Sequence, residues 1–222
     1  MKITNRIISK STAHILFILC VALIAGCGGG GSSSGGSSDS GIPGLTKILI
    51  IADSIGTGAG VVASSSAFPE LIRNAVSVPV VNNSVNSRQV AAGVSAARSL
   101  ISSESPSHII VLLGINDANN GNPSSAISGL RAIADLAQNA GVIALIGTIP
   151  RIPRDSSQNA RAGEISSGIR GIGNARIVEI RNALAPSDVA SDGFHPNASG
   201  QQLIADSFIR ALFGRPCCRL KL

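Results

Sequence analysis

A histidine and an aspartate lie three residues apart near the end of the chain, in the segment DGFHPN (residues 192–197). In a tight loop, Asp192 can place its carboxylate against the Nδ1 atom of His195, which leaves Nε2 free to accept a proton from a serine. A capping aspartate beside a surface histidine would give the same pattern. Beyond residue 26 the chain has only two histidines, and the other, His108, precedes an apolar run instead of following one. We therefore predict that His195 is the base of any histidine-dependent chemistry.

The candidate nucleophile is Ser54, which follows the first strongly apolar run of the chain. Residues 51–58 read IADSIGTG, and Asp, Ser and Gly are ordinary turn residues, so a tight polar turn is one interpretation. The other is a nucleophile elbow, in which the serine is held at the carboxyl edge of a sheet. In that case His195 would activate Ser54 for attack on an acyl carbonyl.

Two further polar segments follow apolar runs. The segment GIND (114–117) contains Asn116, whose amide N–H could stabilise a developing oxyanion, although an Asn-Asp pair also forms turns. The segment VNNSVNS (81–87) leads into a helical pattern. It could donate backbone N–H groups at a helix N-terminus, or it could be a simple polar connection.

The elements that must position these residues alternate between strands and helices. The continuous apolar runs are typical of strands that are covered on both faces, and the helical segments show an apolar stripe. This alternation predicts an α/β fold, a parallel sheet between two layers of helices, whose sites form beyond the carboxyl ends of the strands. We expect no second domain. The predicted strands are 47–52, 78–81, 108–113, 142–147 and 176–180, and the predicted helices are 88–103, 123–140, 156–170 and a last one from residue 197.

The N-terminus has the features of a targeting segment. Three basic residues within the first ten precede the apolar stretch 15–24, which is too short for a comfortable membrane span. The sequence IAGC at its end resembles the bacterial lipobox, which implies cleavage before Cys27 and acylation of that cysteine. An ordinary signal peptide or a short anchor is the alternative.

A low-complexity Gly/Ser stretch (28–41) follows and has no apolar groups to bury, so we expect a flexible tether. Because Gly28 and not an acidic residue follows the cysteine, the usual sorting rule favours the outer membrane. We expect a lipid-anchored protein of the bacterial cell envelope, with its domain in the periplasm or at the cell surface. The predicted parts are a signal peptide (1–26), Cys27 with the tether (27–45), one domain (46–214) and a tail (215–222).

The charge and cysteine content exclude two classes of protein. Of the 18 Lys and Arg residues, three lie within residues 1–26, so the rest of the chain carries 15 against 12 acidic residues. This small surplus is scattered and the chain has no Trp or Tyr, so we expect no nucleic-acid binding. Only the adjacent pair Cys217 and Cys218 lies beyond the lipobox, which excludes a framework of disulfides. This pair would form a vicinal disulfide or remain as two free thiols.

Taken together, the four polar segments resemble the SGNH-hydrolase (GDSL esterase/lipase) superfamily across nearly the whole domain. ADSIGTG corresponds to the GDSL block, with Ser54 as the nucleophile. In NNSVNSRQ, the position of the glycine that supplies an oxyanion N–H falls on Ser87, and in GIND the side-chain oxyanion donor falls on Asn116. DGFHPN corresponds to the block with the remaining triad members, Asp192 and His195.

The chain departs from the family pattern in two blocks. The first block reads Ala-Asp-Ser-Ile instead of Gly-Asp-Ser-Leu, which keeps the aspartate and the serine. In the second block Ser87 replaces glycine, a residue favoured where φ is positive or where substrate passes close to the Cα. A serine there indicates either an allowed φ or a narrower acyl channel.

The resemblance implies a flavodoxin-like, three-layer α/β/α fold with a five-stranded parallel sheet, closest to the small periplasmic thioesterase/lysophospholipase branch. It implies a monomeric serine esterase or lipase that cleaves small acyl esters or thioesters through an acyl-enzyme, with no metal and no organic cofactor. The oxyanion hole would combine the N–H groups of Ser54 and Ser87 with the Asn116 amide. We expect the segment TIPRIPRDS, with Pro150, Arg151, Pro153 and Arg154, to line the acyl or head-group pocket.

Two alternatives remain. The same superfamily also contains carbohydrate and peptidoglycan O-acetylesterases. From a different class, a catalytically inactive SGNH-like surface lipoprotein would keep the fold without the reaction.

Overall fold

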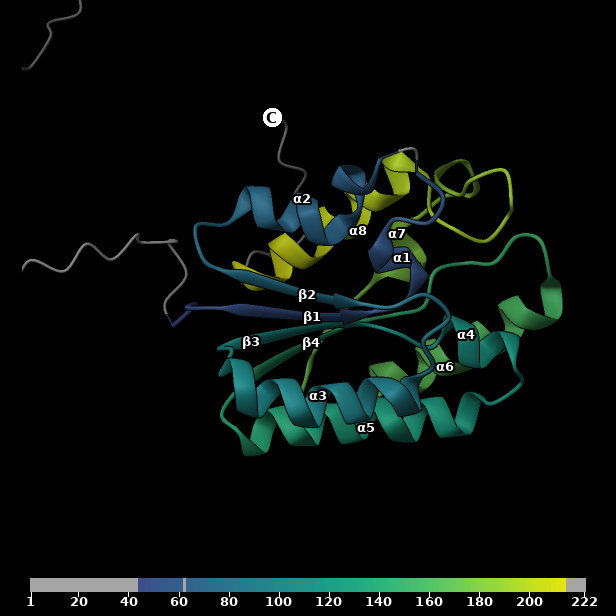
Figure 1. Ribbon diagram of the computed structural model, residues 1–222. Helices are drawn as coiled ribbons and strands as arrows, with labels where there is room; N and C mark the ends of the chain where they lie inside the picture. The colour runs from purple at the N-terminus through teal and green to yellow at the C-terminus, as the bar shows by residue number, and fades with distance from the viewer. Residues whose placement is uncertain (1–43, 62, 215–222) are drawn as a thin grey trace, which may run out of the picture. The chain divides into compact units, whose positions relative to one another are not determined.

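The computed structural model describes residues 44–61 and 63–214, in which strands and helices alternate (Figure 1). The predicted signal peptide, Cys27, nearly all of the tether and the tail with Cys217 and Cys218 lie outside the described residues. In chain order the elements are β1 (Ile48–Ala52), α1 (Ser54–Thr57), the 3₁₀ turn η1 (Ser64–Ser66), α2 (Phe68–Ala75), β2 (Val80–Ser84), α3 (Val90–Glu104), β3 (His108–Leu112), α4 (Ile115–Asn119), α5 (Pro123–Asn139), β4 (Ile143–Gly147), α6 (Ser156–Arg170), β5 (Arg176–Val178), α7 (Ile180–Ala183), the 3₁₀ turn η2 (Pro186–Asp188) and α8 (Ala198–Leu212).

The sheet is parallel throughout and has the strand order β2-β1-β3-β4-β5. Helices α2 and α8 cover one face, and α3 and α5 cover the other (Figure 1). The predicted three-layer α/β/α fold with a five-stranded parallel sheet is therefore confirmed. The strand order reverses between β1 and β3, so the chain leaves these two strands on either side of a crevice at their carboxyl ends, where ligands bind in sheets of this kind.

The two central strands follow directly from their apolar sequences. Every residue of β1 and β3 is buried, because helices lie on both faces of the sheet. His108 begins β3 and therefore lies at the amino end of the sheet. Burial lowers the pKa of His108, and the positive charge of Arg176 lowers it further. This histidine is remote from the carboxyl edge, as the sequence indicates.

The second strand is shifted from its predicted position. It begins at Val80 and continues through Asn82, Asn83 and Ser84, whereas the apolar residues predict a strand over 78–81. Because β2 is an edge strand, its polar side chains remain partly exposed while its backbone pairs with β1. Its last residue, Ser84, pairs with Ala52 of β1, so the segment after β2 begins level with Asp53, next to Ser54. This register brings two of the predicted site segments together.

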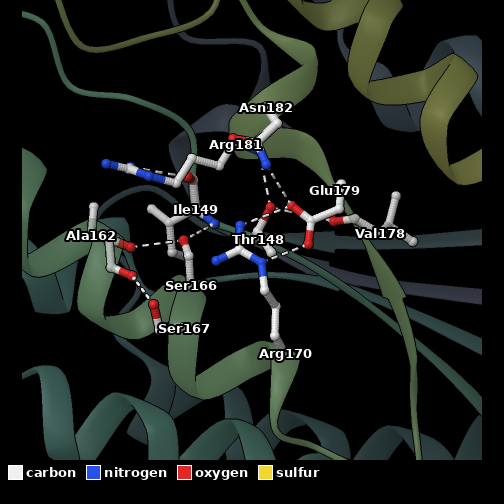
Figure 2. Close-up of polar contacts among 11 residues, drawn as sticks. Thr148, Ile149, Ala162, Ser166, Ser167, Arg170, Val178, Glu179, Arg181 and Asn182 are labelled. Carbon is white, nitrogen blue, oxygen red and sulfur yellow. Dashed lines mark hydrogen bonds and ion pairs between the residues drawn. The ribbon is translucent and has the colours of Figure 1, made fainter.

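The last strand is shorter than predicted, because the chain turns into α7 at Ile180. Polar contacts hold this end of the sheet (Figure 2). The Arg170 guanidinium binds both carboxylate oxygens of Glu179 at 2.8 and 2.9 Å, and the backbone N–H of Arg181 donates to Thr148 Oγ1 at 2.9 Å (Figure 2). These contacts fix α6 and α7 against the end of β4, from which the loop toward the site departs.

Helix α2 is absent from the sequence prediction, because its eight residues show too short a pattern to be recognised. Its position is set by tertiary packing, since Phe68 is fully buried and stacks on Phe208 of α8 with ring centroids 5.8 Å apart. Among residues 44–61 and 63–214, no helix is long and apolar enough to span a membrane.

Candidate active site

The predicted nucleophile is the first residue of α1, at the carboxyl end of β1. The Asp53 carboxylate caps this short helix by accepting a hydrogen bond from Ile55 N–H at 3.0 Å. Gly56 allows the helix to lie close to the sheet, since a Cβ there would come within 2.2 Å of Ser84 Oγ. Ser54 is thereby fixed at the crevice, and the residue is 9% exposed.

The segment before α8 forms a tight loop around the predicted base. His195 Nδ1 lies 2.6 Å from Asp192 Oδ2, and Asp192 Oδ1 accepts hydrogen bonds from the N–H groups of Phe194 at 2.9 Å and His195 at 3.0 Å. Partial burial acts to raise the pKa of Asp192, but these hydrogen bonds outweigh it and lower the pKa to about 2. The carboxylate is therefore ionised at neutral pH and orients the imidazole.

The fold brings the nucleophile and the base together across 141 residues of sequence. Ser54 Oγ lies 3.1 Å from His195 Nε2, within hydrogen-bond range. The segment after α1 passes directly against the histidine loop at Gly60, which has a φ of +92°. A Cβ there would lie 2.7 Å from His195 Cβ, so only glycine fits this close approach. The predicted serine, histidine and aspartate thus form one continuous relay.

Ser87 lies in the turn that follows β2 and precedes α3. Its φ is +59°, a left-handed value at which glycine carries no penalty, and its side chain is exposed in the cleft. Within the described parts of the chain, neither Ser54 N–H nor Ser87 N–H donates a hydrogen bond to another protein group. Two backbone donors therefore remain available beside the nucleophile.

Asn116 lies on α4, at the carboxyl end of β3. Its Nδ2 atom donates one hydrogen bond to the carbonyl oxygen of Arg88 at 3.1 Å, which leaves the second amide hydrogen for another acceptor. The adjacent Asp117 carboxylate accepts a hydrogen bond from Val90 N–H, the first residue of α3, at 3.1 Å. These two contacts tie the asparagine to the turn that carries Ser87.

Two buried carboxylates lie behind these groups. Burial raises the pKa of Asp53 to about 7, partly opposed by the hydrogen bond from Ile55 and increased by the nearby Asp117. Burial also raises the pKa of Asp117, against the hydrogen bond from Val90. The Arg88 guanidinium, which donates to the Asn83 carbonyl, opposes the rise at Asp53. The sequence motifs give no indication of this buried cluster, because its members are separated by long stretches of chain.

Four of the predicted site residues, Ser54, Ser87, Asn116 and His195, line a cleft of about 410 Å³, whereas Asp192 lies behind His195 and is not among the lining residues. Most of its side chains are polar, the two apolar residues being Ala59 and Phe194, and no carboxylate lines it. Of the four residues predicted from TIPRIPRDS, only Arg154 is among the residues that line the cleft. The lining consists of Ser54, Ala59, Asn86, Ser87, Asn116, Asn119, Arg154, Phe194 and His195.

A slightly larger cavity of about 440 Å³ lies at the amino ends of β4 and β5. Its lining includes Gln138, Asn174 and Arg176 but no serine, histidine or carboxylate, so it offers no group for the same chemistry. Among the described residues, no cluster of three or more His, Cys, Asp or Glu side chains could hold a metal ion.

The fold and the relay together define a hydrolase of the serine type. Residues 53–203 match the GDSL-like Lipase/Acylhydrolase family, which spans more than half of the chain, and the protein belongs to this family. It is therefore an ester-bond serine hydrolase of the SGNH/GDSL type, as the four sequence blocks indicate. No curated protein matches the chain.

Several solved structures are similar. TesA superposes with a TM-score of 0.66 at 20% identity, over 75% of this chain and 98% of TesA. A variant of Axe2, an acetyl xylan esterase from Geobacillus stearothermophilus, gives 0.64 at 16% identity, over 78% and 97%. The psychrotrophic esterase EstA from Pseudoalteromonas sp., in a structure inhibited by monoethylphosphonate, gives 0.61 at 18% identity, over 75% and 96%. At these identities the similarity shows the fold.

Proposed function

We propose that this hydrolase cleaves carboxylic esters or thioesters through an acyl-enzyme formed on Ser54. The observation that carries the proposal is the relay of two short contacts, 3.1 Å from Ser54 Oγ to His195 Nε2 and 2.6 Å from His195 Nδ1 to Asp192. His195 is the general base and Asp192 holds its ring and stabilises the imidazolium. No metal or organic cofactor takes part.

The reaction proceeds in two halves. His195 Nε2 takes the proton of Ser54 as Oγ attacks the acyl carbonyl, and the resulting oxyanion accepts hydrogen bonds from Ser54 N–H, Ser87 N–H and the Asn116 amide. His195 then returns the proton to the leaving alcohol or thiol as the bond to the acyl carbon breaks. In the second half, His195 takes a proton from a water molecule as the water oxygen attacks the acyl carbon, and it returns that proton to Ser54 Oγ as the acyl–Oγ bond breaks, which releases the carboxylic acid.

A test of the relay compares single and double variants on a chromogenic acetyl ester. Because nucleophile and base act as a unit, Ser54→Ala, His195→Ala and the double variant should each lose a similar amount of kcat, on the order of 10⁵-fold or more. Melting curves would control for folding. If Ser54→Ala keeps most of the activity, the mechanism is wrong. A wild-type protein inert toward every ester would instead support the alternative of an inactive surface lipoprotein.

The lining of the cleft favours a narrower substrate class, short acyl esters of polar alcohols, which includes the O-acetyl groups of carbohydrates and peptidoglycan. A long acyl chain needs an apolar channel, whereas Asn86, Ser87 and Asn119 line this cleft. One of the similar structures is an acetyl xylan esterase. In a series of para-nitrophenyl esters of increasing chain length, kcat/KM should be highest for acetate or propionate. A maximum at octanoate or longer would exclude this class and favour a lipase.

We also propose that the protein is anchored to the cell envelope through lipidated Cys27, on the basis of the sequence IAGC. Expressed in a Gram-negative host, the full chain should incorporate labelled palmitate and fractionate with membranes, the outer membrane in particular. Cys27→Ser should abolish both. Lipid labelling that persists in this variant would contradict the proposal.

A further inference from the structure

One cationic side chain lies at the cleft and has no role in the relay. The guanidinium carbon of Arg154 lies 4.1 Å from the centre of the Phe194 ring. The same ring makes a T-shaped contact with the imidazole of His195, with ring centroids 4.8 Å apart and an interplanar angle of 85°. The Phe194 ring therefore contacts both the Arg154 guanidinium and the His195 imidazole.

The structure holds this arginine in place from two directions. Arg154 N–H donates to the carbonyl oxygen of Gly193 at 3.3 Å, so its backbone lies directly on the histidine loop. The loop that carries it is fixed at its start by Arg181, whose guanidinium donates to the carbonyl oxygens of Ile149 and Pro150 and to Asn159 Oδ1. The backbone of Arg154 is thus fixed, because its loop is tied to both α7 and the histidine loop, and its exposed side chain packs on Phe194.

The charge of this side chain is not balanced within the cleft. Across the described segments, the Arg154 guanidinium makes no ion pair and no hydrogen bond, although its face packs on Phe194. No carboxylate lines the cleft. Stacking on an aromatic ring leaves the N–H edge of a guanidinium free, and that edge matches the two oxygens of a carboxylate or phosphate.

We propose that Arg154 binds an anionic group of the substrate, carried by the leaving alcohol close to the ester oxygen. This inference rests on the proposed ester hydrolysis at Ser54. It narrows the substrates to short acyl esters of alcohols that bear a carboxylate or a phosphate.

The direction of proton transfer indicates whether the anionic group is on the alcohol or on the acyl part of the substrate. His195 must donate its proton to the leaving oxygen, so the alcohol lies beside the imidazole and the Phe194 ring next to it. The proposed oxyanion donors Ser87 and Asn116 come from the turn after β2 and from α4, so the substrate carbonyl would lie toward these two elements. An anion on the alcohol therefore faces Arg154, whereas an anion on the acyl group points away from it.

The test uses the full chain and matched pairs of aryl acetates. The first pair sets para- and meta-acetoxybenzoate, which carry a carboxylate on the leaving phenol, against their methyl esters. The second pair compares para-nitrophenyl succinate, which has its carboxylate on the acyl side, with the neutral para-nitrophenyl methyl succinate. The measured quantity is the ratio of kcat/KM for the anionic ester to that for the neutral ester. Melting curves confirm that each variant is folded.

For the acetoxybenzoates, the ratio of kcat/KM should be about tenfold higher in the wild type than in Arg154→Gln, because the variant loses one charge-assisted contact. The change should fall mainly on KM, and the preference should weaken with added salt. Arg154→Lys should keep part of it. The control Arg151→Gln removes the same charge from an exposed arginine of the same loop, outside the cleft lining, and should leave the ratio unchanged.

Two results would overturn the inference while leaving ester hydrolysis intact. The first is an acetoxybenzoate ratio that is the same in the wild type and in Arg154→Gln. The second is a ratio that Arg151→Gln lowers as much as Arg154→Gln does. A ratio that changes only for the succinate pair would place the anion on the acyl side and would also contradict the proposal. Failure of the wild type to cleave even the neutral aryl acetates would instead refute the proposed function itself.

Discussion

Two aspartates lie next to the proposed nucleophile and base of this hydrolase, and the structure gives them opposite properties. Asp53, one residue before the nucleophile, is 1% exposed, and burial raises its pKa to about 7. The side chain of Asp192, three residues before the base, is 41% exposed, yet hydrogen bonds from the histidine loop lower its pKa to about 2. In the sequence both are simply an acid beside a residue that we propose to be catalytic.

The difference shows that solvation and hydrogen bonding decide what a carboxyl group does. Asp192 accepts a hydrogen bond from His195 Nδ1 and stays ionised, so it can stabilise the imidazolium that forms in the reaction. Asp53 accepts a single backbone hydrogen bond from Ile55 and holds α1, which carries Ser54. We interpret Asp192 as a partner in catalysis and Asp53 as a positioning residue.

The most severe test of this comparison replaces each aspartate by asparagine. Asp192→Asn keeps the shape but removes the charge and favours the wrong tautomer of His195, so kcat should fall by about 10³–10⁴. Asp53→Asn keeps the acceptor for Ile55 N–H and should stay within about tenfold of wild type. Steady-state kinetics on an acetyl ester would measure both. Equal losses in the two variants would contradict the distinction between the two acids.

A somewhat smaller loss is expected from Asn116→Ala. Removing one oxyanion donor costs about 10²–10³ in kcat with little change in KM. The contact from Asn116 to the Arg88 carbonyl is lost as well, so a melting curve of the variant is needed to show that it is folded. If Asn116→Ala stays within a few-fold of wild type on the best ester, the asparagine is only a turn residue.

The two aspartates should also have opposite effects on stability as the pH changes. Asp53 has a raised pKa in the folded state, so its contribution is fully present below about pH 4 and is lost as the pH rises through about 7. With roughly 1.4 kcal/mol per pKa unit, the loss is on the order of 4 kcal/mol. Asp192 has a lowered pKa, so its contribution is present above about pH 4 and is lost as the pH falls through about 2.

Thermal or urea unfolding between pH 4 and 8 would measure this effect, with Asp53→Asn and Asp192→Asn as the pair of variants. In Asp53→Asn the free energy of unfolding should fall less as the pH rises from 4 to 8. In Asp192→Asn it should fall as much as in the wild type. A wild-type stability that rises steadily from pH 4 to 8, unaltered by Asp53→Asn, would show that Asp53 ionises normally.

The smallest effect is expected at Ser87, where serine has the φ of +59° that favours glycine. Ser87→Gly removes a backbone penalty of about 1–2 kcal/mol, partly offset by the larger entropy of glycine in the unfolded chain, so stability should rise by about 0.5–1 kcal/mol. The kcat value should stay within about tenfold while longer acyl chains become acceptable. Ser87→Ala keeps the penalty and serves as the control. A Ser87→Gly variant less stable than Ser87→Ala would contradict this account.

The sheet and the relay could be predicted from the sequence because their signals are local. Buried strands such as β3 are continuous apolar runs, and each of the polar segments with Ser54, Asn116 and His195 follows such a run or precedes a helix. The rule that sites form at the carboxyl edge of a parallel sheet then places these side chains together.

The remaining features depend on contacts between distant segments. The polar end of β2 pairs as a strand only because β1 lies beside it, and no local pattern marks residues 82–84 as extended. The burial of Asp53, the contact of Asn116 with the Arg88 carbonyl and the stacking of Arg154 on Phe194 likewise arise from tertiary packing. Periodicity and motif spacing carry no information about such contacts.

The most direct test of the account asks which atom becomes acylated. The full chain is treated with a fluorophosphonate, which phosphonylates an activated serine, and the modified peptide is identified by mass spectrometry. Ser54 should be modified once per chain, and labelling should fall steeply in His195→Ala and less in Asp192→Asn. A modified residue other than Ser54, or labelling of Ser54 at the wild-type rate in His195→Ala, would contradict the claim that the relay activates this serine.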